Sequence, residues 1–220
     1  FIEDVEWILE HAPADRQIAL FSATMPGPIR RVADRHLNDP VDMKIANRTL
    51  TLPGTEQFAM RVGRHEKNEA LERVLEAEDY EAVLIFAGTQ RATAELAEHL
   101  QGHGYQAECI HGGMDQTARE AVVQRLKARK TQIVVATDVA ARGLDVDHIG
   151  LVVNYDIPRD QEVYVHRIGR TGRAGRAGRS ITFWQSRDRA MMRAIERFSG
   201  RQMEAMRIPG RAELVDRRRE

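Results

Sequence analysis

The chain has 220 residues, 42% of them hydrophobic and 30% charged, which is typical of a globular protein with one or two domains. Its only cysteine, Cys109, excludes an internal disulfide and fits a cytoplasmic location, and no apolar run approaches the roughly 20 residues that a membrane-spanning helix needs. The net charge is zero, but residues 159–220 hold 16 arginines and 8 acids and therefore carry +8, which attracts phosphates unless it is only a solvated basic face.

The first 46 residues contain two predicted helices and two predicted strands. The pattern predicts a strand over Ile18–Thr24, a helix over Gly27–Leu37 and a short strand over 41–46. These elements are too few for an independent α/β domain, so we expect residues 1–46 to be the end of a preceding domain. Residues 47–57 contain Pro-Gly and lack periodicity, which predicts a linker.

From residue 58 onward, apolar strands alternate with amphipathic helices. The predicted strands are AVLIFAG, QAECIHG, TQIVVAT, GLVVNYD and RSITFW, and the predicted helices are TAELAEHLQGHG, QTAREAVVQRLKAR, QEVYVHRIG and RDRAMMRAIERFSG. Near-continuous apolar strands separated by helices indicate an α/β fold, with a mostly parallel sheet covered on both faces. Ligands of such sheets bind at the carboxyl ends of the strands.

Polar residues follow one of these strand ends. Thr137 and Asp138 come directly after the strand IVVA, and Arg142, Gly143 and Asp145 lie in the loop that follows. A carboxylate there accepts hydrogen bonds from ribose hydroxyls, and Thr137 donates to a phosphate. The alternative is a polar loop in which the two aspartates cap turns and pair with Arg142.

Two other short motifs carry polar side chains. In HGGMDQTARE, Gln116 and Arg119 share one helical face and can meet a sugar-phosphate backbone, or the motif is simply a helix start capped by Asp115. In FSATMPG, Ser22 and Thr24 relay hydrogen bonds between sites, or they cap the following helix.

The stretch HRIGRTGRAGRAGR has glycine at every third position, each followed by arginine. Collagen is excluded because proline is absent, and a dinucleotide-binding turn because the glycines close a helix. A loose RNA-binding segment conflicts with its position between a helix and a strand. We favour the interpretation that Arg170 and Arg173 bind a phosphoryl group while it is transferred. Arg176 and Arg179 are expected to lie in solvent, to pair with acids or to lie near RNA.

Read in order, SATMP, LIFAGT, HGGMDQTARE, ATDVAARGLD and YVHRIGRTGRAGRAG resemble the motifs of DEAD-box RNA helicases of the bacterial cold-shock type. The resemblance covers nearly the whole chain. It implies a RecA-like three-layer α/β/α domain over 58–208 and the end of a first RecA-like domain over 1–46. Residues 47–57 would be the linker, and 209–220 the start of a basic extension.

The resemblance also implies ATP with Mg²⁺ in a cleft between two RecA-like domains, and RNA lying across both. It makes Arg170 and Arg173 arginine fingers, with His166 in the interdomain network, and puts Gly143 and Asp145 at the ATP. The implied RNA contacts are Thr89, Gln116, Arg119 and Thr137, and the implied interdomain coupling residues are Ser22, Ala23, Thr24 and Arg167, the last of which is alternatively structural.

The sequence departs from the family in three places. Gly113 stands where the family usually has an aspartate, and neither a GxxxxGK[ST] loop nor a DEAD sequence is present. We therefore expect the chain to be the C-terminal half of a helicase core, without ATPase activity or a resident metal of its own.

The expected partners are RNA, the first RecA-like domain, and the machinery of ribosome assembly or RNA decay. Self-association through residues 1–46 is a further expectation. The alternatives are a non-enzymatic RNA-binding module and the second domain of a DNA translocase.

Overall fold

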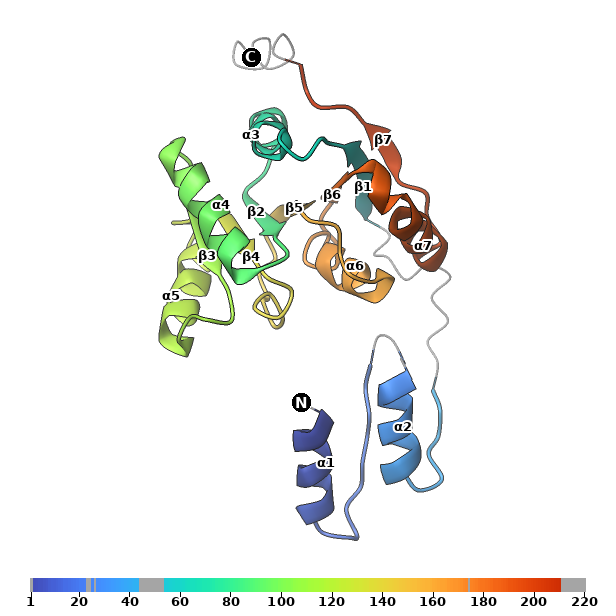
Figure 1. Cartoon of the computed structure of the whole chain (residues 1–220). Helices are drawn as coiled ribbons and strands as arrows, with labels where there is room; N and C mark the ends of the chain where they lie inside the picture. Colours follow the sequence, from blue (N-terminus) through green and yellow to red (C-terminus); the bar gives the residue numbers. More distant parts are fainter. Residues whose placement is uncertain (1, 23–24, 26, 44–53, 174, 211–220) are drawn as a thin grey trace. The chain divides into compact units, whose positions relative to one another are not determined.

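The structure is a computed structural model that describes residues 2–22, 25, 27–43, 54–173 and 175–210. Residues 1–47 and residues 48–220 form two compact units, which are described separately (Figure 1). Within the described residues, no helix is long and apolar enough to cross a membrane.

The first unit contains two helices, α1 (Ile2–His11) and α2 (Gly27–His36). Arg35 joins them through ion pairs of 3.1 Å to Glu6 and 3.7 Å to Glu10. The predicted strands over Ile18–Thr24 and 41–46 are wrong for their described residues 18–22 and 41–43, which are irregular. No strand lies beside them among the described residues of this unit, so their backbone has no ladder to join.

The second unit is built on seven parallel strands in the order β3-β4-β2-β5-β6-β1-β7. Every strand pair is parallel, which confirms the predicted sheet. The strands are β1 (Thr55–Arg61), β2 (Ala82–Phe86), β3 (Ala107–Ile110), β4 (Ile133–Ala136), β5 (Ile149–Asn154), β6 (Gly178–Trp184) and β7 (Glu204–Met206).

Helices cover both faces of the sheet (Figure 1), which confirms the three-layer α/β/α fold. Alternate strand residues point to opposite faces, so Val83 and Ile85 pack under one helical layer and Leu84 and Phe86 under the other. The first layer holds α3 (Lys67–Ala77) and α4 (Gln90–Gly102). The second holds α5 (Gln116–Lys127), α6 (Gln161–Ile168) and α7 (Arg189–Ser199), which follows the short 3₁₀ turn η1 (Ser186–Asp188).

Three elements of this unit were not predicted. Strand β1 begins at Thr55, inside the stretch predicted as a linker, and its buried Thr55 and Gln57 hide the apolar pattern. Helix α3 buries Ala70, Leu71 and Val74, whose spacing is typical of a helix, so this helix could have been predicted from the sequence. Strand β7 has only 3 residues, too few to show a period.

We expect Gly178→Ala to lower the free energy of unfolding by about 2–3 kcal/mol, because the start of β6 is overpacked by any side chain. A methyl group there would lie 2.5 Å from Thr171 Oγ1 and 2.9 Å from Gly172 Cα. Gly175→Ala is the control: its φ is +76°, but no atom lies within 4 Å, so about 1 kcal/mol is expected. Urea denaturation measures both, and an equal cost for the two variants would contradict this packing.

We expect Glu108→Gln to lower stability by about 1 kcal/mol at neutral pH. Arg125 Nε donates to both Glu108 oxygens at 2.9 and 3.1 Å, and the Thr131 hydroxyl also donates to this carboxylate. The Arg125 hydrogen bonds, aided by Thr131, hold the pKa of Glu108 below its usual range against the effect of burial.

Because the pKa of Glu108 is lower in the folded state, its contribution is complete above the unfolded value. It is lost as the pH falls through the folded value. The stabilities of the wild type and of Glu108→Gln, measured by chemical denaturation, should therefore differ more at pH 7 than at about pH 3. A difference that is the same at both pH values would contradict this assignment.

Candidate functional site

The carboxyl ends of β2, β4 and β5 are neighbours in the sheet, although the chain visits them at distant points. Strands β4 and β5 lie on either side of β2, so the connection between them crosses over that strand. The loops that leave such a crossover point diverge and leave room for a ligand. The site is built where these loops meet the C-terminal end of α6.

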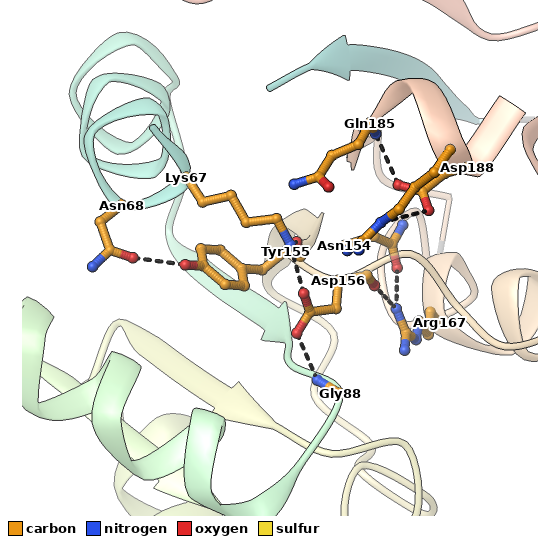
Figure 2. A network of polar contacts seen from close by, with 10 residues as sticks. Lys67, Asn68, Gly88, Asn154, Tyr155, Asp156, Arg167, Gln185 and Asp188 are labelled. Atoms are coloured by element: carbon orange, nitrogen blue, oxygen red, sulfur yellow. Dashed lines mark hydrogen bonds and ion pairs between the residues drawn. The ribbon is translucent and has the colours of Figure 1, made fainter. Parts of the chain in front are cut away.

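Arg167 on α6 ties these loops together, and its side chain is only 2% exposed. Its Nε and Nη2 donate to the two carboxylate oxygens of Asp138 at 2.6 and 2.9 Å. Its Nη1 donates to Asn154 Oδ1 at 3.2 Å and to the Asp156 carbonyl at 2.6 Å (Figure 2). The guanidinium also lies 4.9 Å from the centre of the Phe86 ring. Arg167 therefore holds the domain's own loops, as its structural alternative implied.

Asp156 forms a second junction beside Arg167 (Figure 2). The Gly88 backbone N–H donates to its Oδ2 at 2.9 Å, and Lys67 Nζ pairs with its Oδ1 at 2.6 Å. The Tyr155 hydroxyl donates to Asn68 Oδ1 at 2.7 Å, and burial, aided by the Asp156 charge, raises the pKa of Tyr155 to about 12. This junction fastens the loops after β2 and β5 to α3.

Sequence reasoning did not single out Asp156 or Lys67. Asp156 follows the buried strand β5 by two residues, the same signal that drew attention to Asp138 after β4. Lys67 is the first residue of α3, a helix that was not predicted.

A cavity of about 240 Å³ opens between α6 and the loop after β4. Four of its lining side chains are basic: the buried Arg167, and Arg142, Arg170 and the exposed His166 around it. The cavity therefore combines a cationic rim with an apolar floor, which contains Phe86. Its remaining lining residues are Asp138, Ala141 and Val163.

The Arg173 side chain contacts neighbouring groups of the second unit. Its Nε donates to the Gly169 carbonyl at 2.9 Å, and its Nη1 pairs with Asp145 Oδ1 at 2.6 Å. The predicted ATP residue Asp145 and the predicted finger Arg173 are therefore direct partners. The alternative in which Asp145 and Asp138 pair with Arg142 is wrong, because Asp138 pairs with Arg167 instead.

Arg170 lies next to this pair and is half-buried. Its Nη1 donates to the Leu144 carbonyl at 2.9 Å. Burial, together with the nearby Arg173 charge, holds the pKa of Arg170 below its ordinary value. Gly143 turns the loop with φ +74°, which favours glycine. The structure thus brings Gly143, Asp145, Arg170 and Arg173 to one place.

The four residues predicted to contact RNA lie at starts of helices or in loops. Thr89 caps α4 by accepting a hydrogen bond of 3.1 Å from the Ala92 N–H. Asp115 caps α5 in the same way, as its alternative predicted, and the Gln116 amide donates to Glu120 at 2.6 Å.

Arg119 connects α5 to the loop after β4. Its Nη2 donates to the carbonyls of Ala140 at 2.7 Å and Arg142 at 3.1 Å. Thr137 begins that loop, and its N–H donates to the Ile110 carbonyl at 3.3 Å. Arg119 and Thr137 thus meet at one loop, which also supplies Arg142 to the cavity.

Gly113 lies beside the start of α4. A methyl group on it would come within 2.9 Å of Gln90 Oε1, the movable end of a side chain. The φ of Gly113 is not positive, so the backbone does not require glycine there. The departure from the usual aspartate removes a charge without imposing a special turn.

Arg176 and Arg179 differ from the two arginines before them. Arg176 lies 3.9 Å from Glu81, and Arg179 Nε lies 3.2 Å from Glu56. Arg179 also pairs with Glu78 and packs 4.5 Å from the centre of the Phe58 ring. Both pair with acids, one of the outcomes expected for them.

The predicted coupling motif lies in the first unit. Ser22 is exposed there, whereas Ala23 and Thr24 lie outside the described residues.

The family model described as the helicase conserved C-terminal domain matches residues 66–175. The ATP-dependent RNA helicase DeaD of Escherichia coli K12 is 50% identical over 219 residues, which cover 100% of this chain and 35% of that protein. The chain thus spans about a third of the length of this curated relative.

Two solved structures are similar. The E. coli DEAD-box protein SrmB, bound to regulator of ribonuclease activity A, is 32% identical with a TM-score of 0.65, covering 73% of this chain and 93% of that chain. A Saccharomyces cerevisiae Dbp5 variant bound to RNA and ADP BeF3 is 25% identical with a TM-score of 0.87, covering 98% of this chain and 57% of that chain. The match to the family model over the strands and loops of the site, together with these relatives, shows that the chain belongs to the helicase conserved C-terminal domain family, in its DEAD-box branch.

Proposed function

We propose that the chain is the C-terminal half of an ATP-dependent RNA helicase core, which hydrolyses ATP to unwind or remodel structured RNA. One observation carries the proposal. The loop after β4 and the C-terminal end of α6 bring Asp145, Arg170 and Arg173 together beside a cavity with a basic rim. The relatives named ATP-dependent RNA helicases support it.

The donor set at this cavity fits the phosphate end of a nucleotide. Guanidinium groups match phosphoryl oxygens, and Arg142, Arg170 and Arg173 are all on this edge. The Asp145 side chain is 79% exposed, so its surface ion pair with Arg173 exchanges at little cost. Asp145 is then free to accept hydrogen bonds from a ribose.

ATP with Mg²⁺ would supply the phosphoanhydride bond whose hydrolysis drives the helicase. Arg170 and Arg173 would stabilise the negative charge that develops on the transferred phosphoryl group. His166 lies at the rim and would face the first RecA-like domain. Arg167 would act as a positioning residue, because its fork is fully engaged within this domain.

In this proposal, the second domain does not supply the main ligands of Mg²⁺. Asp138, the carboxylate that lines the cavity, is bound by both arms of Arg167. We therefore assign Mg²⁺ mainly to the first domain.

Thr89, Gln116, Arg119 and Thr137 form the proposed RNA edge. Thr89 and Gln116 begin α4 and α5, where backbone N–H groups and the helix dipole favour phosphates. Arg119 donates to the carbonyl of Arg142, which lines the cavity. This contact links the RNA edge to the nucleotide edge.

A DNA translocase or a binding-only module would use the same fold. ATP hydrolysis by the intact protein, measured with matched single-stranded RNA and DNA oligonucleotides, separates these alternatives. We expect RNA to stimulate hydrolysis and DNA to leave it near its basal rate. Equal stimulation would favour a translocase, and no hydrolysis under any condition would favour a binding module.

The proposed partners are RNA, the first RecA-like domain, and the machinery of ribosome assembly or RNA decay in the cytoplasm. The SrmB structure, which contains a regulator of ribonuclease activity, supports the RNA-decay part. We propose residues 1–46 as the end of the first domain and 209–220 as the extension, whereas the predicted linker 47–57 and second domain 58–208 are corrected at their boundary, because β1 of the second domain already begins at Thr55.

Residues 1–46 are also proposed to associate with a second copy of the chain. Phe21 is 92% exposed, Met43 85% and Val41 83%, whereas Ile18 and Leu20 are half-buried. Light scattering at increasing concentration should show a rising mass for this chain. A strict monomer would count against self-association.

A further inference from the structure

Helices α3 and α4 bring together three side chains with metal-binding atoms, away from the carboxyl edge of the sheet. Glu72 comes from α3, and His99 and His103 come from the last turn of α4 and the residue that caps it. One ligand atom from each of the three lies within 4.8 Å of the others. The histidines are four residues apart, which puts both rings on one face, with centres 4.3 Å apart.

A hydrogen bond orients the His103 ring for metal binding, whereas His99 Nε2 donates to Glu72 Oε1 at 2.6 Å and must move its proton to Nδ1 before it binds a metal. His103 Nδ1 lies 2.8 Å from the His99 carbonyl, which only accepts, so Nδ1 carries the proton. Nε2 is then the ring atom that faces the carboxylate, and it lies 3.8 Å from Glu72 Oε1. A backbone carbonyl bound to the other ring nitrogen is the usual outer support of a histidine metal ligand.

The spacing needs only a small adjustment to hold a cation. Ligand atoms about 2.1 Å from a tetrahedral zinc ion are roughly 3.4 Å apart. Glu72 Oε1 lies 2.6 Å from His99 Nε2 and 3.8 Å from His103 Nε2, values on either side of that spacing. Rotation of half-exposed side chains suffices to equalise them.

The surroundings favour a cation with one open position. The side chains are 28%, 25% and 51% exposed for His99, Glu72 and His103, which leaves access for a water molecule as fourth ligand. The carbonyls at the C-terminal end of α4 add partial negative charge. Imidazole nitrogens select zinc and its transition-metal neighbours over Mg²⁺ and Ca²⁺, which prefer oxygen.

We propose that Glu72, His99 and His103 form a site for Zn²⁺ or a similar divalent transition metal, which clamps α3 to α4. The other end of α4 carries Thr89, roughly 20 Å away along the helix, so the site is separate from the proposed RNA edge. The proposal therefore stands independently of the proposed function. The competing explanation is an ordinary ion pair between a protonated histidine and Glu72.

The test compares the wild-type chain with His103→Gln and with the control His65→Gln, which removes an exposed histidine outside the cluster. Each protein is stripped with a chelator, and Zn²⁺ is titrated in by calorimetry, with Mg²⁺ as the reference ion. We expect the wild type and His65→Gln to bind one Zn²⁺ and to unfold at a higher temperature with it. His103→Gln should bind Zn²⁺ at least about 100-fold more weakly, since even outer-shell changes cost up to that much.

A second readout identifies the ligands. Co²⁺ in place of Zn²⁺ should give the visible absorption of a tetrahedral site in the wild type, and Glu72→Gln and His103→Gln should both lose it. Because His103 is half-exposed, its replacement leaves the helix intact for this comparison. Absence of Zn²⁺ binding in the wild type, or equal binding by His103→Gln, would overturn the proposal in favour of the ion pair.

Discussion

If the proposed function holds, replacing Arg173 by alanine in the intact protein should slow ATP hydrolysis by about a thousandfold, the lower end of what an arginine finger contributes. ATP affinity should change little, because the charge that the guanidinium stabilises develops only during phosphoryl transfer. The fold should survive, since the described hydrogen bonds of the Arg173 side chain go to the Gly169 carbonyl and to the exposed Asp145. Steady-state turnover and equilibrium binding of a fluorescent ATP analogue measure the two effects separately.

Arg176→Ala is the matched control, because Arg176 occupies the next step of the same Gly-Arg repeat. It lies 3.9 Å from Glu81 and is not among the described residues that line the cavity, so turnover should stay within about twofold of the wild type. Equal losses of turnover in both variants would show that the repeat acts only through its charge. Parallel losses of binding and turnover in Arg173→Ala would instead indicate a structural role.

Replacing Arg167 by alanine should lower the free energy of unfolding of this chain by about 3 kcal/mol, because it removes a buried guanidinium with four hydrogen bonds and leaves Asp138, whose side chain is 31% exposed, without its cation. Asp138 would lose two hydrogen bonds, and Asn154 and the Asp156 carbonyl one each. Urea denaturation of the isolated chain measures the effect, because the network lies wholly within the second unit.

Two further variants serve as controls for this stability measurement. Arg142→Ala removes an exposed arginine that lines the same cavity, and it should change stability by less than about 0.5 kcal/mol. Arg167→Lys keeps the charge but loses the planar fork, so it should lie between the wild type and Arg167→Ala. Similar stabilities for Arg167→Ala and Arg142→Ala would contradict the buried network.

The sheet could be predicted because its strands are short, apolar and buried on both faces. Ala82–Phe86 and Ile133–Ala136 are buried at every position, and helices with one apolar face separate them. Because helices separate these apolar runs, the pattern indicates a parallel sheet covered on both faces. Strand β1 was not predicted because its buried polar residues, Thr55 and Gln57, interrupt the apolar pattern as loop residues do.

The predicted strand over Ile18–Thr24 shows the opposite error. Its residues 18–22 have the composition of a strand but are irregular, because strand formation depends on a neighbour that the described part of the first unit does not contain. Local propensity cannot report whether such a neighbour is present.

The location of the site was predictable, but its internal pairings were not. Thr137, Asp138 and Asp145 follow a buried strand, which is enough to place them at the ligand edge. Which arginine each carboxylate meets depends on the loop path through Gly143, whose φ is +74°, and on the end of α6. Arg142 is nearer in sequence to Asp138 and Asp145. Asp138 nevertheless pairs with Arg167, and Asp145 pairs with Arg173.

The central claim is that this chain holds half of an ATPase site and depends on a first RecA-like domain for the other half. The most direct test is ATP hydrolysis by the chain alone and by the chain joined to that domain, each with and without single-stranded RNA. We predict no hydrolysis by the chain alone and RNA-stimulated hydrolysis by the joined protein. Hydrolysis by the chain alone, or none after joining, would contradict the claim.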